Sequence, residues 1–143
     1  MGGRGEGGNI IFFLFIELLR TMNHQANEDK YTLVVVPDEG LQTAGAVLYR
    51  TDFDQTEPTK IWAYSESVDS GDTDNYAEYM GLIIGLAEAR RKCLVNLFVK
   101  GASLQVIEQI QGINQVNDLR LLPLYQRACL LVQRIGRIKF ETI

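Results

Sequence analysis

One expected helix constrains this sequence more than any other segment. Residues 74–86 read DNYAEYMGLIIGL, with a single acid, Glu78, set among apolar residues. A carboxylate in apolar surroundings is unfavourable unless another group binds it, so we expect Glu78 to have a specific partner. Gly81 and Gly85 are four residues apart and share one side of the helix. Because glycine costs about 1 kcal/mol relative to alanine inside a helix, we interpret this pair as the point where the helix approaches a sheet closely.

The remaining composition is typical of a single globular domain. The chain has 143 residues and a formal net charge of −4. This length suits one hydrophobic core, and the acidic total gives no global basic field for nucleic acid. Cys93 and Cys129 lie in apolar helical contexts and are predicted to be buried thiols. With the single histidine they cannot form a zinc site without carboxylates.

Residues 1–30 are predicted to be a tether, a targeting segment or a partner-binding element. A glycine-rich start is followed by the apolar run 10–16 and by Glu17. The run is shorter than the roughly 20 residues that cross a bilayer, so we expect no membrane span. Because it is apolar almost all round, we predict a helix whose surface is covered. The predicted contacts with a protein partner are Ile11, Phe12, Phe15 and Leu19.

Residues 31–143 are predicted to form one α/β domain. Hydrophobic patterning indicates the order β-β-β-α-β-α-α-β. The expected strands are 31–36, 43–50, 60–67, 94–99 and 137–143, and the expected helices are 75–92, 103–111 and 122–135.

Three segments of this domain carry specific motifs. They are residues 36–48, which contain PDEG and AGAVL, residues 75–86, and residues 100–112 with the LLPLY that follows at 121–125. Together they are similar to the ribonuclease H-like domains attached to the reverse transcriptases of retrotransposons. The resemblance implies an α/β three-layer fold. Its mixed five-stranded sheet has three antiparallel strands and then parallel strands, with helices on both faces. Here an N-terminal apolar helix is added.

The resemblance also implies a chemistry. Members of this family cleave the RNA strand of an RNA–DNA hybrid, using several acids that hold two divalent metal ions. Asp38 matches the first acid and Glu78 the second, whereas Ala102 stands where the third is expected. The fourth would lie beyond Ile143. We therefore expect Asp38 and Glu78 to be vestigial catalytic and metal positions, with no cofactor, or with Mg²⁺ if any site survives.

Each acid has a structural interpretation as well. With Asn75 as the N-cap, Glu78 would stand at the third helical position of a capping box. Asp38 follows Pro37 and can be a plain turn acid. Glu39 could substitute for Asp38 if the register differs by one residue.

The candidate nucleic-acid-binding residues are Arg127, Arg134 and Arg137. The first two are seven residues apart on the last expected helix. They would meet phosphates in a binding protein, and otherwise they form a solvated face.

We therefore predict a catalytically degenerate ribonuclease H-like domain that serves as a structural or protein-interaction module, as one subunit of a larger assembly. Two alternatives stay open. One is binding of an RNA–DNA hybrid or RNA without cleavage, and the other is an active hybrid ribonuclease of retrotransposon origin. The absence of enzymatic activity is favoured, and an intracellular location is favoured over secretion.

Overall fold

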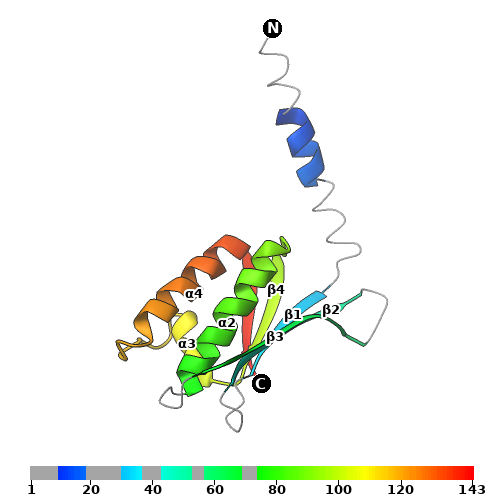
Figure 1. Cartoon of the computed structure of the whole chain (residues 1–143). Helices are drawn as coiled ribbons and strands as arrows, with labels where there is room; N and C mark the ends of the chain where they lie inside the picture. Colours follow the sequence, from blue (N-terminus) through cyan, green and yellow to red (C-terminus); the bar gives the residue numbers. More distant parts are fainter. Residues whose placement is uncertain (1–9, 19–29, 37–42, 53–56, 69–73) are drawn as a thin grey trace.

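The structure is a computed structural model that describes residues 10–18, 30–36, 43–52, 57–68 and 74–143 (Figure 1). Within these ranges the elements follow the predicted order. The strands are β1 (Lys30–Val35), β2 (Thr43–Thr51), β3 (Thr59–Ser67), β4 (Asn96–Gly101) and β5 (Arg137–Thr142). The helices of the domain are α2 (Asp74–Arg91), α3 (Leu104–Ile110) and α4 (Leu122–Ile135).

The five strands form one mixed sheet in the order β3-β2-β1-β4-β5. Antiparallel ladders join β1 to β2 and β2 to β3, whereas parallel ladders join β1 to β4 and β4 to β5. This arrangement confirms the predicted sheet and fold class. Because β1 and β4 run in the same direction, their last residues, Val35 and Gly101, lie side by side at the C-terminal ends of the two strands.

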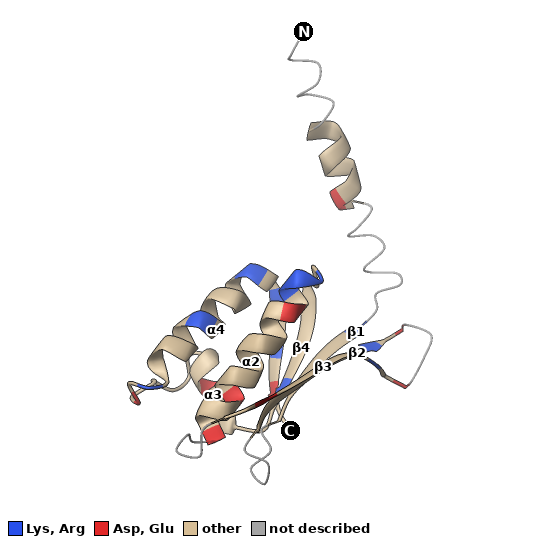
Figure 2. Cartoon of the chain, viewed as in Figure 1, with Lys and Arg blue, Asp and Glu red and all other residues tan. Residues whose placement is uncertain are grey.

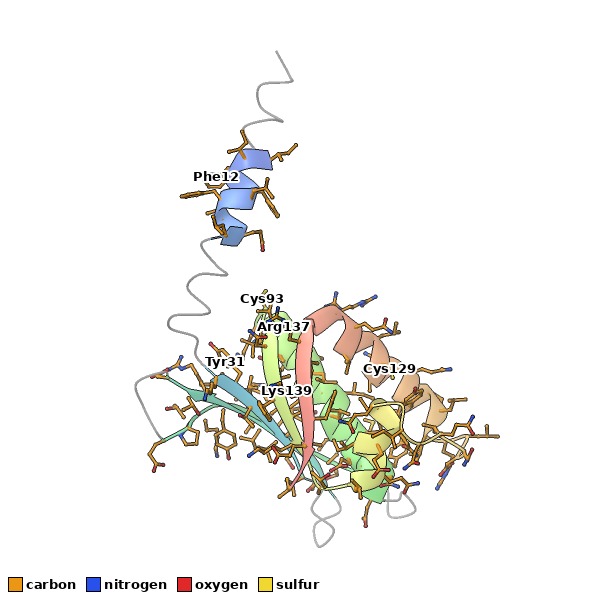
Figure 3. The ribbon with its side chains drawn as sticks, turned by 180° about the vertical axis from the view of Figure 1, so that it is seen from behind. Phe12, Tyr31, Cys93, Cys129, Arg137 and Lys139 are labelled. Atoms are coloured by element: carbon orange, nitrogen blue, oxygen red, sulfur yellow. The ribbon has the colours of Figure 1, made fainter. Side chains whose placement is uncertain are left out.

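The three described helices of the domain lie on one face of the sheet, whereas the sequence predicted helices on both faces. Figure 1 shows α2, α3 and α4 together, and Figure 3 shows the sheet from behind, in front of these helices. The handedness of the connections explains this difference. From β3 to β4, past β2 and β1, and from β4 to β5 the chain moves in the same direction across the sheet. Right-handed crossovers then place both sets of helices on the same face.

Helix α2 approaches the sheet closely at its two glycines, as predicted. A methyl group on Gly81 would lie 2.6 Å from the carbonyl oxygen of Gly45 on β2. A methyl group on Gly85 would lie 2.5 Å from a methyl carbon of Leu33 on β1. Leu33 is fully buried in the core. Larger residues at these two positions would therefore push α2 away from the sheet.

The turn between α2 and β4 differs from the prediction. Cys93 has a φ of 60°, the left-handed conformation that most often ends a helix at glycine. Its amide donates to the Arg90 carbonyl at 2.9 Å, and the Leu94 amide donates to the Ala89 carbonyl at 3.0 Å. This helix-ending turn delays the start of β4. It also leaves Cys93 exposed, and Cys129 is only half-buried, so the prediction of two buried thiols is wrong.

Residues 10–18 form the predicted N-terminal apolar helix (Figure 1). Its side chains are exposed, with exposed fractions of 70% for Ile11, 66% for Phe12 and 57% for Phe15. Leu19 lies outside the described residues. None of the helices in the described ranges is long and apolar enough to cross a bilayer. The predicted protein partner at this helix stays a prediction.

Candidate functional site

The candidate site lies at the C-terminal ends of the neighbouring parallel strands β1 and β4. Val35 pairs there with Gly101, and the Ala102 amide donates to the Val35 carbonyl at 3.3 Å. Glu78 on α2 reaches the same strand ends, because its Oε1 would lie 3.4 Å from a Cβ on Gly101. The structure therefore brings together Glu78 and Ala102, the second and third acid positions of the resemblance. Asp38 lies outside the described residues.

The backbone of the turn between β4 and α3 binds the Glu78 carboxylate. Oε1 accepts hydrogen bonds from the amides of Ala102 at 2.5 Å and Ser103 at 2.9 Å. Oε2 accepts from the Ser103 amide at 2.8 Å. Glu78 is only 1% exposed. The expectation of a specific partner is thus confirmed, and that partner is a pair of N–H groups.

The capping-box interpretation of this region is wrong. Helix α2 begins at Asp74, so Asn75 lies inside its first turn. The Asn75 side chain instead joins α2 to α3: Oδ1 accepts from the Ser103 hydroxyl at 2.7 Å, and Nδ2 donates to Gln105 Oε1 at 2.7 Å. Ser103 Oγ also accepts from the Val106 amide at 3.2 Å, as the N-cap of α3. Sequence reasoning missed this cluster. The one local signal was a serine directly before an apolar helical pattern.

A buried hydrogen bond between Tyr79 and Gln109 makes a second link from α2 to α3. The Tyr79 hydroxyl donates to Gln109 Oε1 at 2.7 Å, and both side chains are buried. Burial is the main cause that raises the pKa of Tyr79, so its hydroxyl is a neutral donor. Sequence reasoning did not find this pair, because each residue on its own fits the helical pattern.

Two opposing effects act on the pKa of Glu78. Burial raises it above the ordinary value of 4.5, since desolvation disfavours the charged form. The hydrogen bonds from the Ser103 and Ala102 amides lower it, but burial is the larger effect and the pKa stays raised. Glu78 therefore holds its proton to a higher pH than an exposed glutamate does.

The described residues at these strand ends do not fit a two-metal site. A carboxylate that ligates Mg²⁺ presents its oxygens to the ion. Both oxygens of Glu78 accept backbone N–H groups instead, and Ala102 offers only a methyl group. Over the described ranges, no cluster of three or more His, Cys, Asp or Glu could hold a metal ion. Glu78 acts here as a bridge from α2 to the turn after β4.

The three candidate nucleic-acid-binding arginines lie on α4 and β5, and the strand register separates Arg137 from the site. Arg127 and Arg134 are on α4, and Arg137 is the first residue of β5. Arg137 pairs with the first residue of β4, whereas the site lies at the last residue, Gly101. At about 3.3 Å per residue, these ends are roughly 16 Å apart. The ribbon is coloured for Lys and Arg where α2 and α4 end (Figure 2). The role of the arginines stays a prediction.

The order of the elements along the chain and the order of the strands in the sheet define a ribonuclease H-like domain. The sequence model of the reverse transcriptase-like family matches residues 35–143, and the chain belongs to that family. This result confirms the family suggested by the sequence motifs.

Solved structures agree with this assignment. The N-terminal RNase H domain of Rv2228c from Mycobacterium tuberculosis, solved as a fusion with maltose-binding protein, is 28% identical with a TM-score of 0.63, over 80% of this chain and 83% of that one. RNase H1 of Halobacterium salinarum is 19% identical with a TM-score of 0.62, over 80% and 84%. LC11-RNase H1, solved in complex with an RNA/DNA hybrid, is 22% identical with a TM-score of 0.61, over 80% and 85%. The last two show the fold alone.

Relatives of known sequence are longer than this chain. The bifunctional protein Rv2228c of Mycobacterium tuberculosis is 33% identical over 99 residues, which are 69% of this chain and 26% of that protein. The uncharacterized protein Mb2253c of Mycobacterium bovis matches with the same values. The chain thus spans about a quarter of the length of these relatives.

Proposed function

We propose that this ribonuclease H-like domain does not cleave RNA–DNA hybrids and serves as a structural or protein-interaction module of a larger assembly. One observation carries the proposal: both oxygens of the Glu78 carboxylate accept N–H groups of the turn that contains Ala102. Two-metal hydrolysis needs carboxylates that converge on the ions. Here one of these side chains bridges backbone elements, and the next position has no ligand atom.

Ala102→Asp is the direct test. Ala102 is exposed, so an aspartate fits without repacking the core. We expect no cleavage of an RNA–DNA hybrid by the wild type in Mg²⁺, and no change of its melting temperature with the ion. We expect the aspartate variant to gain a Mg²⁺-dependent rise in melting temperature, since an ion that binds only the folded state stabilises it. Ala102→Asn is the matched neutral control. Wild-type cleavage that is abolished by Glu78→Gln would overturn the proposal.

Binding of an RNA–DNA hybrid without cleavage is the second candidate. The exposed side chains of Arg127, Arg134 and Arg137 favour it, as does the hybrid bound to LC11-RNase H1. Binding through phosphates would weaken steeply with salt, and replacing the three arginines by alanine would reduce the slope of log K against log salt. Absence of hybrid binding at low salt would eliminate this candidate.

A further inference from the structure

The face of the sheet opposite the helices has no described element over it. Leu33 and Val35 on β1 lie under α2, next to its glycines. Successive side chains of a strand point to opposite faces, so Thr32 and Val34 point to the other face, where they are half-buried. We call this second side the open face.

Ladder partners extend the open face across the three strands β2, β1 and β4. Thr32 pairs with Tyr49 on β2 and with Phe98 on β4, and Val34 pairs with Val47 on β2. An apolar strip therefore crosses the middle of the open face. It consists of Val34, Val47, Tyr49 and Phe98, and Phe98 is 40% exposed.

Cationic side chains border this apolar strip on the β5 side. Phe98 pairs through β4 with Lys139 on β5, whose ammonium group lies 6.0 Å from the centre of the Phe98 ring. Lys100 and Arg137 belong to the same face by strand alternation and are exposed. Figure 3 shows Arg137 and Lys139 on the strand nearest the viewer. The open face is thus apolar in the middle and basic along one side, with Glu141 as its acidic member.

The strands β1, β4 and β5 are parallel, and parallel strands are normally covered on both faces. This chain contains an apolar element of a size that could cover them. The helix at residues 10–18 has exposed apolar side chains on every side. At about 1.5 Å per residue it is roughly 13 Å long. The three spacings from β2 to β5 measure about 14 Å. Its one charged residue, Glu17, is an acid, which complements the basic border of the open face.

The connection to β1 allows this contact within one chain. Residues 19–29 separate the helix from Lys30, the first residue of the central strand. Eleven residues reach at most roughly 36–40 Å, which exceeds the size of the open face. A tether of this length gives the helix a high effective concentration at that face.

We propose that the helix at residues 10–18 docks on the open face of its own domain, with its apolar side chains over the strip of Val34, Val47, Tyr49 and Phe98 and Glu17 toward the basic border on β5. The occupant is this segment of the same chain, and the contact does not depend on whether the domain cleaves nucleic acid.

Paramagnetic broadening of nuclear magnetic resonance signals tests this contact in the full chain. A nitroxide is attached at Leu14→Cys, in a chain whose Cys93 and Cys129 are replaced by serine. We expect loss of intensity for the methyl signals of Val34 and Val47 on the open face. The methyl signal of Ala128, which is buried on α4, should keep its intensity. The broadening should not change on dilution.

Variants and mixing identify the occupant. Phe12→Asp with Phe15→Asp, and separately Phe98→Glu, should each restore the Val34 and Val47 signals. Leu130→Glu is the matched control, because Leu130 is 52% exposed on α4, away from the open face. Far-ultraviolet circular dichroism checks the fold, and the helix double variant decides the matter if Phe98→Glu does not fold. Undiminished open-face signals would overturn the proposal. A mixture of chains that carry only the nitroxide with chains that carry only the isotope label detects contacts between two molecules. Broadening of the open-face signals in this mixture would also overturn the proposal, because a second copy would then be the occupant.

Discussion

The two ends of α2 each hold a glutamate, and the two carboxylates are stabilised in opposite ways. Glu78 is buried near the start of the helix, and backbone amides of another element bind it. Glu88, near the end, bonds to Arg91 of the same helix at 2.6 Å and 3.0 Å and to Lys92, the residue after the helix, at 3.1 Å. The first carboxylate joins distant parts of the fold, and the second stabilises a helix end.

The pKa values follow this difference. Burial raises the pKa of Glu78, whereas hydrogen bonds and nearby charge from Arg91 and Lys92 lower the pKa of Glu88 to about 2. The same residue type on one helix therefore gives opposite dependences of stability on pH. The comparison teaches that the structural role of a carboxylate follows from the groups that bind it. Glu78 links two parts of the fold because backbone amides bind it, whereas Glu88 pairs with neighbouring cations.

Glu78→Ala should have the largest effect. It leaves the Ser103 N–H group without an acceptor, whereas the Ala102 N–H group keeps its bond to the Val35 carbonyl. An unsatisfied buried donor costs about 1–3 kcal/mol, so we expect the free energy of unfolding, measured by denaturant unfolding, to fall by about that amount. Glu88→Ala is the matched control on the same helix and should cost less than about 1 kcal/mol. Equal losses for the two variants would remove the distinction between the bridge and the helix end.

Glu78→Gln should change how stability depends on pH. The folded pKa of Glu78 lies above its unfolded value of 4.5. Between these values the folded state binds more protons than the unfolded state, so the wild type loses stability as the pH rises. We therefore expect the free energy of unfolding of the wild type, relative to Glu78→Gln, to decrease as the pH rises above 4.5. A difference that stays constant with pH would show that Glu78 does not titrate abnormally.

Glu88→Gln should have the smallest effect and the opposite sign with pH. The lowered pKa means that Glu88 stabilises the fold above pH 4.5 and loses this contribution as the pH falls toward about 2. Its partner Arg91 has a side chain that is 70% exposed, so solvent screening limits the contribution to about 0.2–1 kcal/mol. Urea unfolding at neutral pH and near pH 2 checks this. A larger loss at the acidic end would contradict the expectation.

Much of the fold could be predicted from local patterns. The spacing of Gly81 and Gly85 predicted a close helix–sheet contact, and the structure shows it at Gly45 and Leu33. Such contacts depend on side-chain size at fixed helical spacing, which a sequence displays directly. The order of the elements along the chain followed from hydrophobic periodicity, whereas the arrangement of the strands in the sheet was implied by the family resemblance.

The bonding of the candidate site could not be predicted in the same way. A single acid among apolar residues predicted that Glu78 has a partner, but the partners are main-chain groups of Ala102 and Ser103. Every residue except proline carries such an N–H group, so no residue type marks it in the sequence. The left-handed turn at Cys93 was missed for a related reason, since tertiary context there overrides the preference for glycine.

The hydrogen bond from the Ala102 amide to Glu78 has a consequence for which residues position 102 can accept in evolution. The turn contributes to folding through an amide that any amino acid except proline supplies, while the Ala102 side chain faces solvent. Single-nucleotide changes at this codon can therefore replace one side chain by another with little selection from folding. An aspartate introduced at position 102 would likewise leave the bond from this amide to Glu78 in place.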